Sequence, residues 1–409
     1  MSTRAPIRHV AARRETSETT IRIPSAYRAG FSAARALDPA QAEAYVRHTT
    51  VGDPHADAVA EDLASLSPDQ VHSLLARAFL DPASPPRDLP ESLRSLVADS
   101  AILPDWFDAD LARTASRAFL RNSDIVLAAL VGGSIVEGFS TLISKSFRVR
   151  GRVTNMGVRR LKQNGLQLVE QYLPGGMNPG ADGWRLSVRV RLVHAQSRHY
   201  LRRSEEWNRE KYGMPISTAH VLLAGSAFSG RLMQHVATLG GDFTQEERDA
   251  YVHVWRYTGR LIGIPEPLIF HDESSAVRAF RLGSICEPEP DYDAIIMANS
   301  IVNSAPLVVG VTDIPKRRAL ARTVYQASRE LIGDRLADKF LFPCNRRKVV
   351  PFLRFQNRSR RVRRKVFPRW GQRDRLAKFN ALMNFVDLGS SEHSYRLPTA
   401  ARDEESAEW

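Results

Sequence analysis

Histidine is the residue type in this chain that points to metal chemistry, and the surroundings of His194 are the most informative. His194 and His199 are five residues apart, about 140° around a helix, so they cannot bind one metal ion from the same helical face. The sequence contains no H-E-x-x-H motif. A zinc or non-haem iron site made from two nearby histidines is therefore disfavoured, which leaves ligation of haem iron by a single histidine.

The residues around His194 suit a porphyrin if this segment is helical. Val190, Arg191, Arg198 and Leu201 would then lie one or two turns from it. Apolar side chains can pack on a macrocycle, and guanidinium groups can bind its two propionates. We therefore expect Arg191 and Arg198 to be cofactor-binding residues. The alternative, a hydrogen-bonded structural histidine, is the commoner role of a lone histidine on a helix and stays open.

The sequence predicts that the elements positioning these residues are helices. Ser67 with Gln70 and Thr244 with Glu247 form capping boxes, and Asp38 precedes a proline at a helix start. Strand signals are sparse. The main exception, residues 186–192, alternates apolar and polar residues but also forms a stripe at helical spacing, so local periodicity does not decide it. We predict an all-α fold.

One apolar run, from Ile125 to Ile143, is about as long as a membrane span. It contains three glycines and Glu137, so a buried core helix is the better interpretation. Of the 409 residues, 43% are hydrophobic and 25% are charged, the ordinary balance of a folded globular protein. We expect one large core with tails.

The net charge of +13 is concentrated near the end of the chain. Thirteen arginines and lysines lie between Arg346 and Arg375 against one acid, Asp374, and aromatic and aliphatic residues are interleaved with them. This composition favours an anionic membrane surface. Nucleic acid is the less expected partner, although the same residue types bind it, and a solvated basic face on the core is a further alternative.

Cysteine usage and the N-terminus bear on location. Only Cys286 and Cys344 are present, so neither a disulfide framework nor a thiolate metal site is expected. No apolar run follows Arg13 and Arg14, where an export signal would need one. We expect a cytoplasmic protein, peripheral at the membrane if the basic segment binds lipid.

Several ordered motifs resemble the rubber oxygenases (latex clearing proteins) and mycophenolic-acid oxygenases. Their signature block is similar to four segments here, which are Arg159-Arg160-Leu161, residues 172–180 (YLPGGMNPG), Gly183-Trp184-Arg185 and residues 189–195 (RVRLVHA). Residues 103–108, 213–217 and 250–265 also resemble family segments. The resemblance covers roughly residues 103–270 and is weak beyond them.

The resemblance implies a globin-like helical core with additional helices that binds haem b. It implies that His194, in the Arg-Leu-x-His-Ala segment, is the axial iron ligand, with dioxygen as co-substrate on the opposite side of the haem. Arg160, thirty-four residues before His194, matches the family arginine near the haem pocket.

Two positions depart from the family pattern. Asn164 stands where the family has threonine, and Ser144 stands where it has the glutamate proposed as acid/base group. Glu137 lies seven residues before Ser144, on the same face if one helix spans both. We therefore include Arg160, Asn164 and Glu137 as candidate catalytic residues, while Glu137 in a simple ion pair is an equal alternative.

These inferences combine into one expectation. Residues 25–342 form a helical haem-binding oxygenase domain that acts on a hydrophobic, small isoprenoid or lipid substrate. Residues 1–24 and 379–409 are tails, and 343–378 form the basic aromatic segment. The alternative is a helical module that binds anionic membranes without catalysis. The substrate, the redox partner and the oligomeric state do not follow from the sequence.

Overall fold

The computed structural model describes residues 22–149, 156–344, 348–386 and 397. The regular elements among these residues are all helices, joined by turns and loops. No strand occurs among the described residues, which confirms the all-α prediction. The core is one continuous cluster of buried side chains drawn from helices along the whole chain. Residues 1–21 of the predicted tail at 1–24, most of the other predicted tail (387–396 and 398–409) and residues 345–347 of the basic segment lie outside the described residues.

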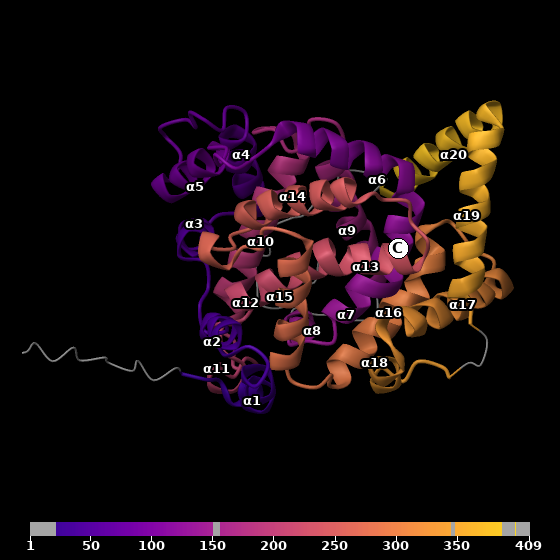
Figure 1. Cartoon of the computed structure of the whole chain (residues 1–409). Coiled ribbons are helices and arrows are strands. Elements are labelled where there is room, and N and C mark those ends of the chain that lie inside the picture. Colours follow the sequence, from indigo (N-terminus) through magenta and orange to yellow (C-terminus); the bar gives the residue numbers. More distant parts are fainter. Residues whose placement is uncertain (1–21, 150–155, 345–347, 387–396, 398–409) are drawn as a thin grey trace, which may run out of the picture.

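The N-terminal helices pack along one side of the molecule (Figure 1). Three of them begin at a side-chain cap, since Asp38, Asp53 and Ser67 each accept a hydrogen bond from a backbone amide of the first turn. The Ser67–Gln70 capping box is present as predicted. These helices are α1 (Arg28–Arg35), α2 (Pro39–His48), α3 (Pro54–Leu63), α4 (Pro68–Ala78) and α5 (Glu91–Ala101).

The apolar run forms a central helix. α6 (Ala109–Ala129) continues through a π-helical turn, η2 (Leu130–Ser134), into α7 (Ile135–Gly138). Residues 109–138 are long and apolar enough to cross a membrane by length and composition, yet 78% of their most apolar window is buried inside the fold. The core-helix interpretation is confirmed.

The next helices form an antiparallel hairpin. α8 (Ile143–Val149) precedes α9 (Met156–Tyr172), which a short glycine-containing turn connects to α10 (Asp182–Leu201). Residues 186–192, which were ambiguous in the sequence, are helical within α10. Trp184 is fully buried, and its indole donates to the carbonyl of Ser100 in α5 (3.1 Å).

The second half of the chain completes the bundle. α14 lies along α6, and Thr244–Glu247 forms its predicted capping box. A second π-helical turn, η3 (Ala227–Arg231), faces η2. The remaining core helices are α11 (Arg209–Tyr212), α12 (Thr218–Ser226), α13 (Leu232–Thr238), α14 (Gln245–Leu261), α15 (Glu273–Cys286), α16 (Tyr292–Val308), α17 (Ile314–Ile332) and α18 (Asp334–Lys339).

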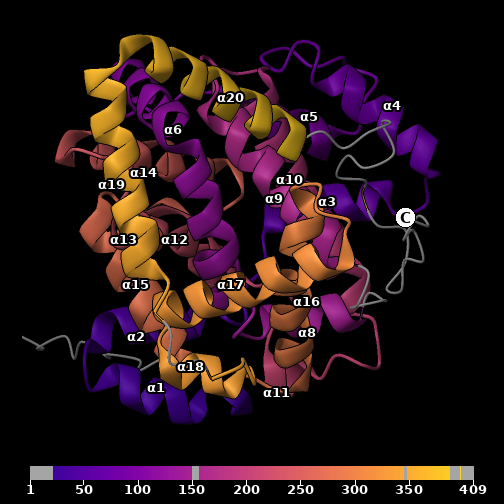
Figure 2. The ribbon, with the colours of Figure 1, turned by 90° about the vertical axis from the view of Figure 1, so that its right-hand side faces the viewer.

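The basic segment forms two helices, α19 (Val350–Val366) and α20 (Pro368–Val386). Figure 2 shows α19 running along one edge of the molecule and α20 turning back across the top. α20 packs on α6 and α9, and it continues through the boundary that we predicted at residue 378. The segment is therefore part of the folded unit.

Candidate functional site

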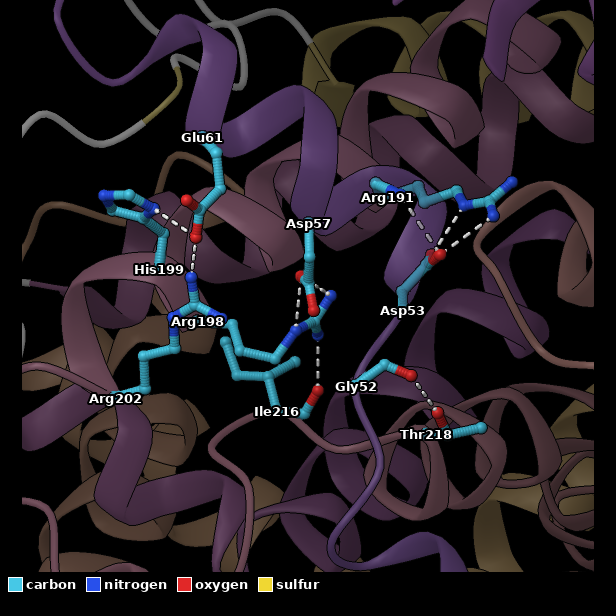
Figure 3. A network of polar contacts seen from close by, with 11 residues as sticks. Gly52, Asp53, Asp57, Glu61, Arg191, Arg198, His199, Arg202, Ile216 and Thr218 are labelled. Carbon is cyan, nitrogen blue, oxygen red and sulfur yellow. Dashed lines mark hydrogen bonds and ion pairs between the residues drawn. The ribbon is translucent and has the colours of Figure 1, made fainter. Parts of the chain in front are cut away.

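The helix that carries His194 is held by a ladder of ion pairs to α3. Asp53, Asp57 and Glu61, spaced four residues apart, face Arg191 and Arg198 of α10 and Arg202, the residue directly after it (Figure 3). Arg191 donates to Asp53 through Nε (2.6 Å) and Nη2 (3.0 Å). Arg198 donates to Asp57 (2.7 Å) and to the carbonyl of Ile216 (2.7 Å). Buried charge-assisted contacts of this kind fix the rotation of α10 about its axis.

Arg191 and Arg198 thus have partners other than the propionates that we predicted for them. The Arg198 side chain is 2% exposed, and the side chains of Arg191 and Asp53 are mostly buried. Burial raises the pKa of Asp53, but Arg191, the Ala56 amide and the charge of Arg198 together lower it by more, so the net pKa lies below its ordinary value. Both guanidinium groups position α10 in this structure.

His194 lies in α10, between the ladder residues Arg191 and Arg198. It is three residues from Arg191 and four from Arg198, so it is about 40–60° around the helix from them. Gln171 of α9 contacts Ser187 of α10 (3.4 Å). Two turns further along each helix, seven residues in both cases, Asn164 and His194 occupy the same level on the facing sides. His194 is partly exposed there.

Arg160 and Asn164, the candidate residues on α9, are one turn apart. The Asn164 side-chain amide donates to the Arg160 carbonyl (2.9 Å). The Arg160 guanidinium lies 4.0 Å from the ring centroid of Phe147 in α8. Ser144 is three residues before Phe147 and shares its side of α8. The structure therefore places Arg160 beside the helical face that carries Ser144.

The premise that Glu137 and Ser144 share one helix is wrong. α7 ends at Gly138 and α8 begins at Ile143, so a turn separates the two residues. The Ser144 hydroxyl is buried and donates to the Thr141 carbonyl (2.8 Å). Glu287 of the α15–α16 loop accepts a hydrogen bond from the Leu142 amide (3.0 Å), which secures the turn.

Glu137 belongs to a buried charged cluster with η3 and α13. Its carboxylate accepts hydrogen bonds from Arg231 (2.5–3.2 Å) and lies 3.0 Å from His235 Nε2. Burial raises the pKa of Glu137, but His235 and Arg231 lower it by more, so the net pKa is below its ordinary value. The carboxylate is therefore ionised at neutral pH. The sequence signal for this cluster was the i, i+4 spacing of Arg231 and His235, which we did not use.

An apolar cavity of about 540 Å³ lies between the core and the C-terminal helices. Its walls come from α6, η2, α9, α16, α17, α19 and α20, and include Leu127, Val131, Leu161, Val324, Leu382 and Phe385. Leu161 follows Arg160 directly, so the cavity reaches the part of α9 that carries the candidate residues. On one side, Asp124 of α6 pairs with Lys378 of α20 (2.5 Å) and with Arg360 of α19 (3.6 Å).

The side chains that could bind a metal suit a cofactor that takes only one ligand from the protein. Among the described residues, no three histidine, cysteine or acidic side chains are grouped so that they could hold a metal ion. A haem needs only an axial ligand from the protein, because its macrocycle supplies the equatorial nitrogens. His194, on the facing side of α10 and held by the ladder, fits that requirement.

The family of this chain follows from comparison with known protein families. Residues 117–387 match the family model "ER-bound oxygenase mpaB/B'/Rubber oxygenase, catalytic domain". The chain belongs to this family. The matched region contains every candidate residue named above, from Glu137 to Arg198, and extends to the end of α20.

Two known proteins are similar to the chain, one in sequence and one in structure. A rubber oxygenase of Streptomyces sp. (strain K30) is 27% identical over 238 residues, which span 55% of this chain and 56% of that protein. The matched region is thus about half the length of this relative. A structure of latex clearing protein in the closed state superposes with a TM-score of 0.62, at 19% identity, and covers 84% of this chain and 92% of that one. The chain therefore has the latex-clearing-protein fold.

Proposed function

We propose that this protein is a haem b-dependent oxygenase that uses dioxygen to oxidise a small hydrophobic substrate, an isoprenoid or lipid with a C=C bond. Membership of the rubber oxygenase family carries the proposal, since it makes an oxygenase the expected activity. Family membership lends no support to a non-catalytic membrane-binding module.

His194 is the proposed axial ligand, and the ladder to α3 is its support. When bound, haem supplies the oxygen-activating chemistry, and the chain supplies the geometry. Because Asp53, Asp57 and Glu61 hold α10 from one side, they would keep the His194 imidazole from turning about the helix axis.

The cavity beneath α20 is the proposed site for the apolar part of the substrate. Its volume of about 540 Å³ lies within the range of pockets for small organic ligands, roughly 300–1,000 Å³. Its aliphatic and aromatic lining would exclude water from the reacting bond. A cavity of this size favours a small substrate over a polymer threaded through the protein.

Arg160 and Asn164 are the proposed polar residues at the reacting end. Arg160 carries a fixed positive charge that can orient an oxygen atom of a substrate or product. Asn164, at the level of His194, can donate or accept a hydrogen bond. Glu137 is the weaker candidate, because its lowered pKa and its ion pair with Arg231 oppose proton donation.

The experiment is a combined spectrum and turnover assay. The purified full chain is supplemented with haem, its absorption spectrum is recorded, and oxygen uptake is measured with farnesol, geranylgeraniol and squalene. We expect a Soret band, oxygen consumption, and carbonyl products from cleavage. A chain that takes up no haem, or that binds haem but consumes no oxygen with any of these substrates, would overturn the proposal.

A further inference from the structure

Helix α19 has two faces of different character. Val350, Leu353 and Asn357 lie on the inner face, where Leu353 lines the cavity and the Asn357 amide donates to the Leu239 carbonyl (2.9 Å). The opposite face carries an apolar stripe at helical spacing that is exposed to solvent. Its members are Phe352, Phe355, Val362 and Val366, with exposed fractions of 60, 67, 55 and 61%.

The basic side chains of α19 and α20 fall into two groups, those with a carboxylate partner and those without one. Some have carboxylate partners within the fold, as Arg361 has Asp242 (2.8 Å) and Arg364 has Asp374 of α20 (2.6 Å). Seven exposed cations have no carboxylate partner in the part of the chain that the structure describes. They are Arg354, Arg358, Arg363, Lys365, Arg369, Arg373 and Arg375.

The exposed apolar residues continue past the corner between the helices. Phe367 lies at the corner and is 59% exposed, and Leu376 and Phe379 follow on the outer face of α20. Figures 1 and 2 place both helices at the edge of the molecule. Exposed apolar side chains of this number in two helices mark an interaction surface, since isolated ones are the norm elsewhere.

We propose that this outer face of α19 and α20, the hairpin face, binds the surface of an anionic lipid bilayer. Guanidinium and ammonium groups would meet lipid phosphates and carboxylates, while the phenylalanine, valine and leucine side chains enter the interface. With 17 residues, α19 is about 25 Å long, which allows it to lie in the membrane plane.

Two other partners fit the face less well. A second copy of this chain would bring the same uncompensated cations against each other, which disfavours a symmetric dimer. Single-stranded nucleic acid stacks on aromatic rings, but Val362, Val366 and Leu376 have no ring for a base. An anionic bilayer accepts both the aliphatic side chains and the charges.

The hairpin face also bears on substrate delivery, a consequence that rests on the proposed function. The inner faces of the same helices line the cavity through Leu353, Ala377, Leu382 and Phe385. Docking of the hairpin would therefore bring the cavity wall to the source of a lipid-soluble substrate. The binding itself needs neither haem nor turnover.

The test is co-sedimentation of the full chain with vesicles of phosphatidylcholine alone or with 30% phosphatidylserine. The charge variant is Arg358→Gln, Arg363→Gln and Lys365→Gln. Its control is Lys316→Gln, Arg318→Gln and Arg322→Gln in α17, which removes the same charge from another surface. The apolar variant is Phe352→Ser, Phe355→Ser and Val362→Ser, matched by Leu37→Ser, Leu80→Ser and Ile102→Ser, whose side chains are also exposed.

We expect binding to the anionic vesicles that weakens with salt, and little binding to neutral ones. Because it removes three cations that would lie at the lipid surface, the α19 charge variant should lose tenfold to a hundredfold in partitioning, and the α17 control about twofold. The apolar variant should lose at least tenfold, with its circular dichroism unchanged. Equal losses in the α17 control, equal binding to neutral vesicles, or binding to a single-stranded oligonucleotide but not to vesicles would overturn the proposal.

Discussion

Arg191 and Asp53, 138 residues apart in the chain, form a two-point ion pair that ties the His194 helix to α3. The Arg191 side chain is 16% exposed and Asp53 is 11% exposed, so little water competes for either. Asp53 also accepts from the Ala56 amide and so caps α3. One carboxylate therefore both starts α3 and fixes α10.

We predict that Asp53→Ala destabilises the protein by about 3–5 kcal/mol, because it leaves a buried guanidinium without its partner. The fraction of protein that binds haem should also fall, since α10 loses its ion pair with Asp53. Urea unfolding followed by circular dichroism measures the change. Glu43→Ala, which breaks the exposed Arg35–Glu43 pair, is the control and should cost less than about 1 kcal/mol. A loss as small as the control's would show that the ladder does not hold α10.

Stability should decline as the solution is acidified. The pKa values of Asp53 and Glu137 lie below their ordinary values of 3.8 and 4.5 in the folded protein. The unfolded chain therefore binds more protons in the acidic range, and the free energy of unfolding falls as the pH drops through 4.5 and below. Unfolding free energies between pH 7 and pH 3 measure this. Asp53→Asn should flatten the profile, and a wild-type profile that is flat or rises toward pH 3 contradicts the assignment.

Arg160→Ala should leave some haem bound and reduce occupancy or turnover by about tenfold to a hundredfold, the usual effect of a residue that supports a metal site without binding the metal. Lys162→Ala, two residues along the same helix, is the control. Pyridine haemochrome content and oxygen uptake give the two readouts. Wild-type values for both in Arg160→Ala would remove this arginine from the site.

Ser144→Glu should gain cleavage of polyisoprene, because it restores a carboxylate at the family position, on the side of α8 that faces Arg160. The wild-type chain should prefer short isoprenoids. Product chromatography on both substrates tests this, alongside Glu137→Gln, which should lower stability and keep the substrate preference. If Ser144→Glu gains nothing and a folded Glu137→Gln loses turnover of every substrate, Glu137 is the acid/base group.

The features of the fold that the sequence predicts correctly depend on interactions between residues close together in the chain. The caps at Asp38, Ser67 and Thr244 act within one turn, so their helices start where they were expected. The identity of residues 186–192 as helix depends on partners such as Asp53, more than a hundred residues away. The same kind of long-range pairing joins Arg191 to Asp53 and Arg198 to Asp57, which helical periodicity alone does not reveal.

Contacts between distant segments also explain the errors. The break after Gly138 is secured by Glu287, whose contact with Leu142 spans 145 residues. His253 of α14 is buried, accepts a hydrogen bond from the Asp108 amide (2.9 Å) and stacks on Phe107, both far from it in the sequence. The residue pattern within α14 does not reveal that the loop before α6 covers this histidine.

The central claim is that His194 binds the haem iron, and the absorption spectrum of His194→Ala tests it most directly. After haem supplementation we predict loss of the Soret band with unchanged helical circular dichroism, because the variant removes the axial ligand and leaves the ladder in place. His199→Ala, five residues along α10, should keep the band. Stoichiometric haem with an unchanged spectrum in His194→Ala would contradict the account.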